Sequence, residues 1–155
     1  MIRYNIYNSV NSLGKIEKDK IVEFLFEHLD QYGDKKEDIA RCLDYAVKKT
    51  TYLPDAVAMG GFIITAEEEK EIIGSVVINK TGMKGYIPEN ILVYIAMHKK
   101  ARGKGIGKAL MQKAIDLADG DIALHVEKDN PARFLYEKLG FTNPYLEMRL
   151  KKQSK

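Results

Sequence analysis

The sequence has little of several features that mark specialised classes of protein. Its 155 residues include no tryptophan and a single cysteine, Cys42. An internal disulfide is therefore excluded, and a reducing cytoplasm is the expected location. The uncharged stretch 56–66 is far shorter than the roughly 18 apolar residues that a membrane-spanning helix needs. The first residues also lack the basic region and apolar run of a secretory signal. These features predict a cytoplasmic protein with no membrane partner.

Neither sign of charge dominates the chain. Its 25 Lys and Arg residues nearly balance 22 Asp and Glu residues, which leaves a net charge of +3. With 45% hydrophobic residues, 12 glycines and 4 prolines, the composition excludes collagen-like, coiled-coil and wholly disordered chains. The length fits one domain. We predict a single domain over residues 1–150 and a short polar tail at 151–155.

Hydrophobic periodicity predicts strands that alternate with helices. The expected strands are residues 2–7, 57–65, 72–79, 91–97, 122–126 and 145–150. The expected helices begin near Ile16, Asp34, Ile106 and Asn130, and the Asp34-x-x-Glu37 pattern is typical of a capping box. Such an order predicts an α/β fold in which one mixed sheet carries helices on its faces. The strand-helix-strand unit at its centre should be parallel.

The segment Arg102-Gly103-Lys104-Gly105-Ile106-Gly107-Lys108 lies between a predicted buried strand and a predicted helix. A turn here would aim backbone N–H groups and the positive end of the helix at one point, which suits a phosphate group. Glycines would let the phosphate approach the main chain. The spacing fits neither a Walker loop nor the dinucleotide pattern G-x-G-x-x-G, so an ATPase or an ordinary nicotinamide enzyme is not expected.

This segment is also strongly basic. Lys99, Lys100, Arg102, Lys104 and Lys108 lie within ten residues that hold no acidic residue. Such a run is compatible with a solvated face or with a nonspecific nucleic-acid patch over residues 99–108.

A second motif, about 25 residues downstream, completes the pattern. The first motif reads R-x-x-G-x-G, and the second runs from Asn130 to Phe141. Together they resemble the GNAT superfamily of N-acetyltransferases, whose motifs read [Q/R]-x-x-G-x-[G/A] and N-x-x-A-x-x-x-Y-x-K-x-G-F. Asn130, Tyr136, Lys138, Gly140 and Phe141 match, whereas the alanine, Ala132, stands one place early. The resemblance covers roughly residues 72–150. It implies a single GNAT-like domain with a mostly antiparallel sheet of about six to seven strands and about four helices.

The resemblance implies acetyl-CoA as a co-substrate. No metal is expected, because His28 and His98 have no partners at metal-ligand spacing. The CoA pyrophosphate would be held by the backbone of Arg102, Gly103, Lys104, Gly105, Ile106 and Gly107, with Lys108 opening the helix. The pantetheine arm would lie between strands 91–97 and 122–126, bonded near Ile95 and Met97 and contacted by Asn130. The cation cluster is then explained by the phosphates of CoA, without nucleic acid as a partner.

The implied reaction is direct attack by an amine on the thioester. A backbone N–H near Met97, at a bulge in the strand, would stabilise the oxyanion. Tyr136 would protonate the leaving sulfur, since a phenol is a suitable acid at neutral pH. The strand 91–97 lacks the carboxylate common among relatives, which leaves Glu89, His125 and Glu127 as candidate bases.

The sequence leaves the acceptor open. We predict an N-acetyltransferase acting on a primary amine of a small molecule or peptide, and because relatives often dimerise, a homodimer is compatible with the resemblance. One alternative is a CoA-binding sensor module without catalysis. Another is a nucleic-acid-binding domain that uses residues 99–108.

Overall fold

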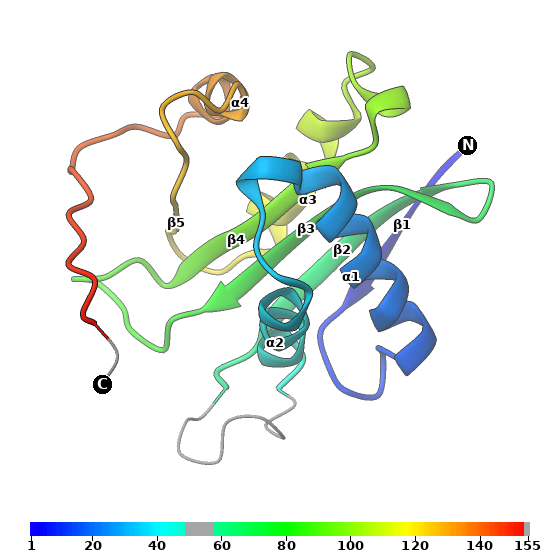
Figure 1. Cartoon of the computed structure of the whole chain (residues 1–155), viewed down its shortest axis with the longest axis horizontal. Helices are drawn as coiled ribbons and strands as arrows, with labels where there is room; N and C mark the ends of the chain where they lie inside the picture. The colour runs from blue at the N-terminus through cyan, green and yellow to red at the C-terminus, as the bar shows by residue number, and fades with distance from the viewer. Residues whose placement is uncertain (49–57, 154–155) are drawn as a thin grey trace.

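Figure 1 shows the computed structural model, in which residues 1–48 and 58–153 are described. The strands are β1 (Ile2–Tyr7), β2 (Gly61–Glu68), β3 (Glu71–Lys80), β4 (Asn90–Met97) and β5 (Ile122–Leu124). The α-helices are α1 (Lys15–Leu29), α2 (Lys36–Ala46), α3 (Ile106–Leu117) and α4 (Ala132–Lys138). Two 3-10 turns, η1 (Asp30–Tyr32) and η2 (Lys99–Ala101), follow α1 and β4. No helix within the described ranges is long and apolar enough to cross a membrane.

The strands form one sheet in the order β1-β2-β3-β4-β5. All neighbours pair antiparallel except β4 and β5, which are parallel and joined through α3. Helices α1 and α2 bury Leu25, Leu43 and their neighbours on one face, while α3 buries Leu110 and Met111 on the other, where Tyr136 of α4 joins them. Figure 1 shows α1 and α2 in front of the sheet and α3 behind it. The predicted mixed sheet, parallel unit and four α-helices are confirmed, with five strands in the described part of the chain.

Strand β4 contains a one-residue bulge. Val77 of β3 faces Tyr94, whereas the next residue, Ile78, faces Leu92, so Val93 is the extra residue. A bulge changes which side chains share a face, because strand side chains otherwise alternate with period two. Leu92 consequently packs beneath α3, whereas Tyr94 packs beneath α1 and α2.

Three local predictions differ from the structure. The expected strand 145–150 does not form, and Leu146, Met148 and Leu150 stay 86–90% exposed. Alternation supplies an apolar face, but a strand also needs a neighbouring backbone, and no described strand pairs with this segment. Likewise, β5 ends at Leu124 rather than at residue 126.

The predicted capping box of the second helix is also wrong. Helix α2 has Lys35 as its N-cap and no side-chain cap, because the Asp34 carboxylate instead accepts a bond from the Tyr94 hydroxyl at 2.6 Å. The β2–β3 hairpin is confirmed, although the predicted start of its first strand, Val57, lies outside the described residues.

Asn90 fixes the start of β5 beside β4. Its side chain is 1% exposed, and its Nδ2 donates to the carbonyl of Asp119 at 2.9 Å and of Asp121 at 3.2 Å. The backbone N–H of Asn90 also donates to the Asp121 carbonyl, at 3.0 Å. One buried amide therefore anchors the turn that leads into the parallel strand.

We expect Asn90→Ala to lower the free energy of unfolding by about 2 kcal/mol, since it removes two buried side-chain hydrogen bonds and takes from the Asp119 carbonyl the donor that Asn90 supplies. Urea denaturation followed by circular dichroism measures this loss. Asn8→Ala, at an exposed asparagine, is the control and should change stability by less than about 0.5 kcal/mol. Equal stability of the two variants would remove the anchoring role.

Candidate active site

The basic glycine segment forms an open turn at the N-terminus of α3. Gly103 and Gly105 have φ of +78° and +76°, and a Cβ on either would meet nothing within 4 Å. Such φ values disfavour other residues, and the space beside them leaves the main chain accessible. The first helical bond joins the N–H of Ala109 to the Gly105 carbonyl, so the N–H groups of Ile106, Gly107 and Lys108 precede the helical ladder. This geometry suits an anion such as phosphate.

Strands β4 and β5 separate next to this turn. They pair through only three residues each, the last pair being Leu92 and Leu124, while β4 continues to Met97. Figure 1 shows β5 turning away from β4 toward α4. The β5-side edge of β4 from Val93 to Met97 therefore has no strand neighbour among the described residues. Beyond the gap, the Tyr32 hydroxyl donates to the Asp129 carbonyl at 3.3 Å, which links the α1–α2 connection to the loop after β5.

Several predicted site residues meet at this end of β4. Ile95 and Met97 pack in the same cluster as Tyr136. A Cβ on Gly107 would lie 3.5 Å from Met97 Cγ and 3.8 Å from a methyl of Leu135, so the first turn of α3 touches both β4 and α4. Asn130 begins the turn into α4, where its Oδ1 accepts from the N–H of Ala132 at 2.9 Å.

Tyr136 is 7% exposed, and its ring packs against Phe141 with centroids 5.9 Å apart. Burial raises the pKa of its phenol to about 12, because the charged phenolate would lose solvation. Its hydroxyl makes no hydrogen bond within the described part of the chain. Tyr136 is therefore a fully protonated donor at neutral pH.

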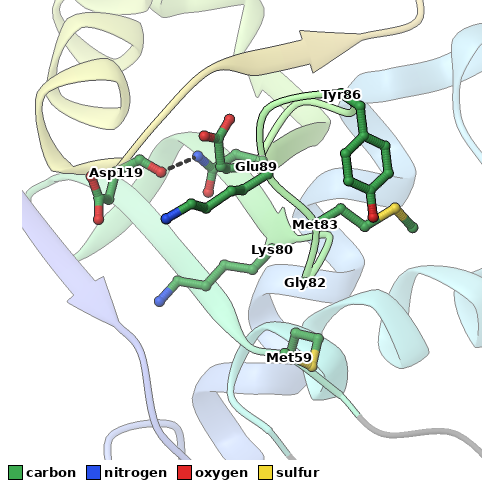
Figure 2. A pocket seen from close by; sticks show the side chains of 9 residues that line it. Met59, Lys80, Gly82, Met83, Tyr86, Glu89 and Asp119 are labelled. Atoms are coloured by element: carbon green, nitrogen blue, oxygen red, sulfur yellow. Dashed lines mark hydrogen bonds between the residues drawn. The ribbon is translucent and has the colours of Figure 1, made fainter.

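Glu89 lies elsewhere. It precedes β4, and its Oε1 accepts from the N–H of Asp121 at 3.2 Å. It lines a hollow of about 430 Å³ together with Lys80, Met83 and Tyr86 (Figure 2). At about 3.3 Å per residue, the eight residues of β4 separate the backbone of Glu89 from that of Met97 by roughly 25 Å. The structure does not bring Glu89 together with Tyr136.

The bulge also lies away from its expected place. Residues Tyr94 to Met97 pair regularly with β3, and the extra residue is Val93, so the expected bulge near Met97 is wrong. The register is set by how β3 and β4 pair, which the composition of one strand does not reveal. A backbone N–H exposed by the bulge therefore lies near Val93, where β4 and β5 begin to separate, rather than near Met97.

The other candidate bases, His125 and Glu127, are exposed on the loop after β5. The motifs of the sequence do not indicate the pair formed by Tyr94 and Asp34, in which Tyr94 lies directly after the bulge on the α1–α2 face. Burial and the Asp34 carboxylate raise the pKa of Tyr94 well above its usual range. Only the polarity of Tyr94 within an apolar strand could have pointed to it.

The described residues contain neither a cysteine with the features of a nucleophile nor a group of side chains that could bind a metal. Cys42 lies on α2 and packs against the core on that face of the sheet, and burial raises the pKa of its thiol to about 12, which suits packing rather than nucleophilic attack. Within the described ranges, no three His, Cys, Asp or Glu side chains lie together as a metal-binding group.

Residues 20–141 match the acetyltransferase (GNAT) family. Because that match covers more than half of the sequence, the chain belongs to the GNAT family of acetyltransferases, and the resemblance drawn from its two motifs is confirmed. The match also reaches further toward the N-terminus than those motifs. A curated relative is the 5-NmdU N-acetyltransferase of Pseudomonas phage PaMx11, which is 37% identical over 84 residues, or 53% of this chain. The aligned region spans 58% of that relative's length.

Solved structures share the fold at low sequence identity. A GNAT-family acetyltransferase from Streptococcus pneumoniae TIGR4 superposes with a TM-score of 0.68 at 14% identity, covering 99% of this chain and 100% of the other. The aminoglycoside N-acetyltransferase AAC(6')-Iy, solved in complex with CoA, gives 0.66 at 13% identity and covers 99% and 97%. The ribosomal-protein-alanine N-acetyltransferase of Brucella melitensis biovar Abortus 2308 gives 0.61 at 16% identity and covers 98% and 100%.

The raised pKa of Tyr136 has a measurable consequence for stability. Its contribution is fully present below pH 10 and is lost as pH rises toward 12, because the unfolded chain gives up the phenolic proton first. Between pH 9 and 11 we expect the wild type to lose about 1 kcal/mol more unfolding free energy than Tyr136→Phe. Urea denaturation at each pH measures this loss. Tyr145→Phe, which changes an exposed tyrosine, is the control and should lose as much unfolding free energy as the wild type.

Proposed function

We propose that the protein transfers the acetyl group of acetyl-CoA to a primary amine of a small molecule or peptide. The observation that carries this proposal is the open glycine turn at the end of β4, placed at the mouth of the gap between β4 and β5. Family membership supports acetyl transfer, and the CoA complex of a protein with the same fold supports the co-substrate.

In this proposal the glycine turn holds the CoA pyrophosphate. The donors are backbone N–H groups of residues 103–107, because the N–H of Arg102 already donates to the Lys99 carbonyl. Lys104 and Lys108 supply positive charge at exposed positions. The free edge of β4 near Ile95 and Met97 hydrogen-bonds the amide groups of the pantetheine arm. The Nδ2 of Asn130 contacts the same arm, since its Oδ1 already caps the turn into α4.

Acetyl-CoA supplies an activated carbonyl carbon. The amine nitrogen bonds to that carbon, the carbon–sulfur bond breaks, and the electron pair leaves with sulfur. Tyr136 donates its phenolic proton to the sulfur, and a backbone N–H near Val93 stabilises the developing oxyanion. Glu89 lines a separate hollow and its Oε1 accepts from the N–H of Asp121, so we assign the amine proton to solvent water. Solvent water also returns a proton to the Tyr136 phenolate, which restores the enzyme for the next turnover.

The acceptor is proposed only as a class. The printed name of the phage relative makes 5-NmdU a rational first compound to test, together with aminoglycosides, amino acids and N-terminal peptides. The cytoplasmic location and the homodimer stay predictions.

Acetyl-CoA at about 100 times its Kd should raise the Tm of the wild type by several degrees, because binding adds roughly 2.7 kcal/mol. Gly107→Trp should lose this shift, since an indole does not fit beside Met97 and Leu135 and would displace the first turn of α3, whose N–H groups hold the phosphate in this proposal. Gly107→Ala should keep it, because its Cβ meets only ordinary contacts.

Differential scanning fluorimetry measures all three proteins, with circular dichroism confirming that each variant folds. A short DNA duplex serves as the competing ligand. A Tm shift with DNA but not with acetyl-CoA would replace the proposal with a nucleic-acid function.

Tyr136→Phe should lower turnover by about 10- to 1000-fold and leave the Kd for acetyl-CoA nearly unchanged, because only the donated proton is lost. Thiol release with a responsive amine measures turnover, and calorimetry measures the Kd. Tyr145→Phe is the matched control and should retain full turnover. Unaltered turnover in Tyr136→Phe would make Tyr136 a packing residue, and acetyl-CoA binding without turnover of any amine would indicate a sensor module.

A further inference from the structure

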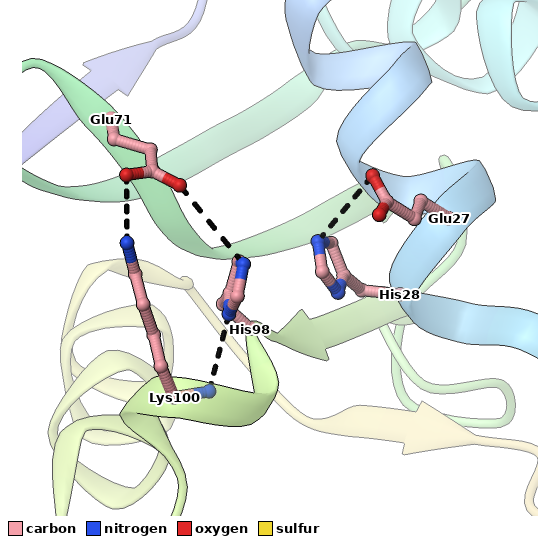
Figure 3. A network of polar contacts seen from close by, with 5 residues as sticks. All are labelled: Glu27, His28, Glu71, His98 and Lys100. Atoms are coloured by element: carbon pink, nitrogen blue, oxygen red, sulfur yellow. Dashed lines mark hydrogen bonds and ion pairs between the residues drawn. The ribbon is translucent and has the colours of Figure 1, made fainter.

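Imidazole and charged side chains cluster beside the glycine turn, on the face covered by α1 (Figure 3). His98 follows the last residue of β4, and its backbone N–H donates to the Ile73 carbonyl of β3 at 2.8 Å. Its side chain then turns forward, and Nδ1 accepts from the backbone N–H of Lys100 at 3.1 Å. His98 is thus both the anchored end of the sheet and the N-cap of η2.

This hydrogen bond requires one protonation state. Nδ1 accepts a bond only when it carries no proton, so the proton of the neutral ring is on Nε2. Nε2 lies 4.0 Å from Oε1 of Glu71, whose other oxygen binds Lys100 Nζ at 2.7 Å. Figure 3 shows Glu71 on one side of the imidazole and the Lys100 backbone on the other. A second proton on the ring would sit on Nδ1, so that two N–H groups, that of Nδ1 and that of the Lys100 backbone, would face each other and the hydrogen bond would be lost.

The capped turn leads directly into the glycine segment. The N–H of Ala101 donates to the His98 carbonyl at 2.9 Å, and the N–H of Arg102 donates to the Lys99 carbonyl at 3.3 Å. Ala101 is 3% exposed, which fixes the turn against the body of the domain. Arg102 is the first residue of the phosphate motif, so the conformation of η2 sets where that motif begins.

Ionisable groups from three elements surround His98. Helix α1 contributes His28, whose ring centroid is 4.5 Å away, and Glu27, whose Oε2 is 3.8 Å from His28 Nε2. Strand β3 contributes Glu71, and the turn itself contributes the cations Lys99, Lys100 and Arg102. Burial lowers the pKa of His28, and the nearby cations act in the same direction against Glu27. His28 therefore gains a proton less readily than an ordinary histidine.

We propose that neutral His98 is a positioning residue for the CoA-phosphate turn, so that its protonation releases η2 and weakens CoA binding. This inference rests on the proposed function of the turn. The direction in which CoA affinity changes when His98 is protonated distinguishes two opposing effects. A lost cap weakens binding, whereas an added positive charge alone would strengthen the hold on phosphate.

Calorimetric titration of the wild-type protein with CoA between pH 8 and pH 5.5 tests the proposal. Histidines ordinarily change charge within this range, but so does a terminal phosphate of the ligand, so variants are compared at each pH. His98→Asn keeps an oxygen that accepts from Lys100 and has no titrating group. It should bind within twofold of the wild type at pH 8 and about fivefold more tightly than the wild type at pH 5.5.

His98→Phe keeps a ring of similar size but no acceptor, so it should bind CoA about fivefold more weakly at pH 8. His28→Gln is the matched control. Because it keeps His98, it should behave like the wild type and bind CoA more weakly than His98→Asn at pH 5.5. Identical pH profiles for the wild type and His98→Asn, or tighter wild-type binding in acid, would overturn the role of His98 while leaving CoA binding intact. A wild-type protein that binds no CoA at any pH would overturn the proposed function as well.

Discussion

The early end of backbone pairing between β4 and β5 is the constraint on which the rest of the site depends. Neighbouring parallel strands normally form backbone hydrogen bonds along their whole length, but the pairing of β4 and β5 stops at Leu92 and Leu124. From Val93 to Met97, the backbone groups on the β5 side of β4 have no strand neighbour among the described residues, and a ligand with amide groups can hydrogen-bond to them. Asn90 makes this arrangement possible, because its buried amide holds β5 in place at the one end where the strands do meet.

The bulge at Val93 and the gap act together. By inserting one residue, the bulge sends Tyr94 toward α1 and α2 while Ile95 and Met97 face α3 and α4. The open stretch of β4 therefore presents different chemistry to each layer: a tyrosine held by Asp34 on one side, and an apolar wall that includes Tyr136 on the other.

Much of the glycine turn, which we propose as the phosphate site, is visible in the sequence because it is local. Glycines at positions that need positive φ, a helix that begins within two residues and a run of cations are all encoded by neighbours in the chain. The same locality explains why the helices and the β2–β3 hairpin were predictable. It also explains one failure: Asp34 and Glu37 have capping-box spacing, yet Asp34 binds Tyr94, a partner 60 residues away in sequence.

The sequence by itself determined the succession of strands and helices, the glycine turn and the order of the two family motifs, since each depends on residues within one helical turn or one loop. Only the tertiary structure decided which residues face one another. Strand register placed the bulge at Val93 rather than near Met97, and the fold gave the Glu89 carboxylate a partner in the N–H of Asp121. Segment 145–150 has the alternation of a strand but remains unpaired. Pairing depends on distant backbone groups, and a local hydrophobic pattern carries no record of where those groups lie.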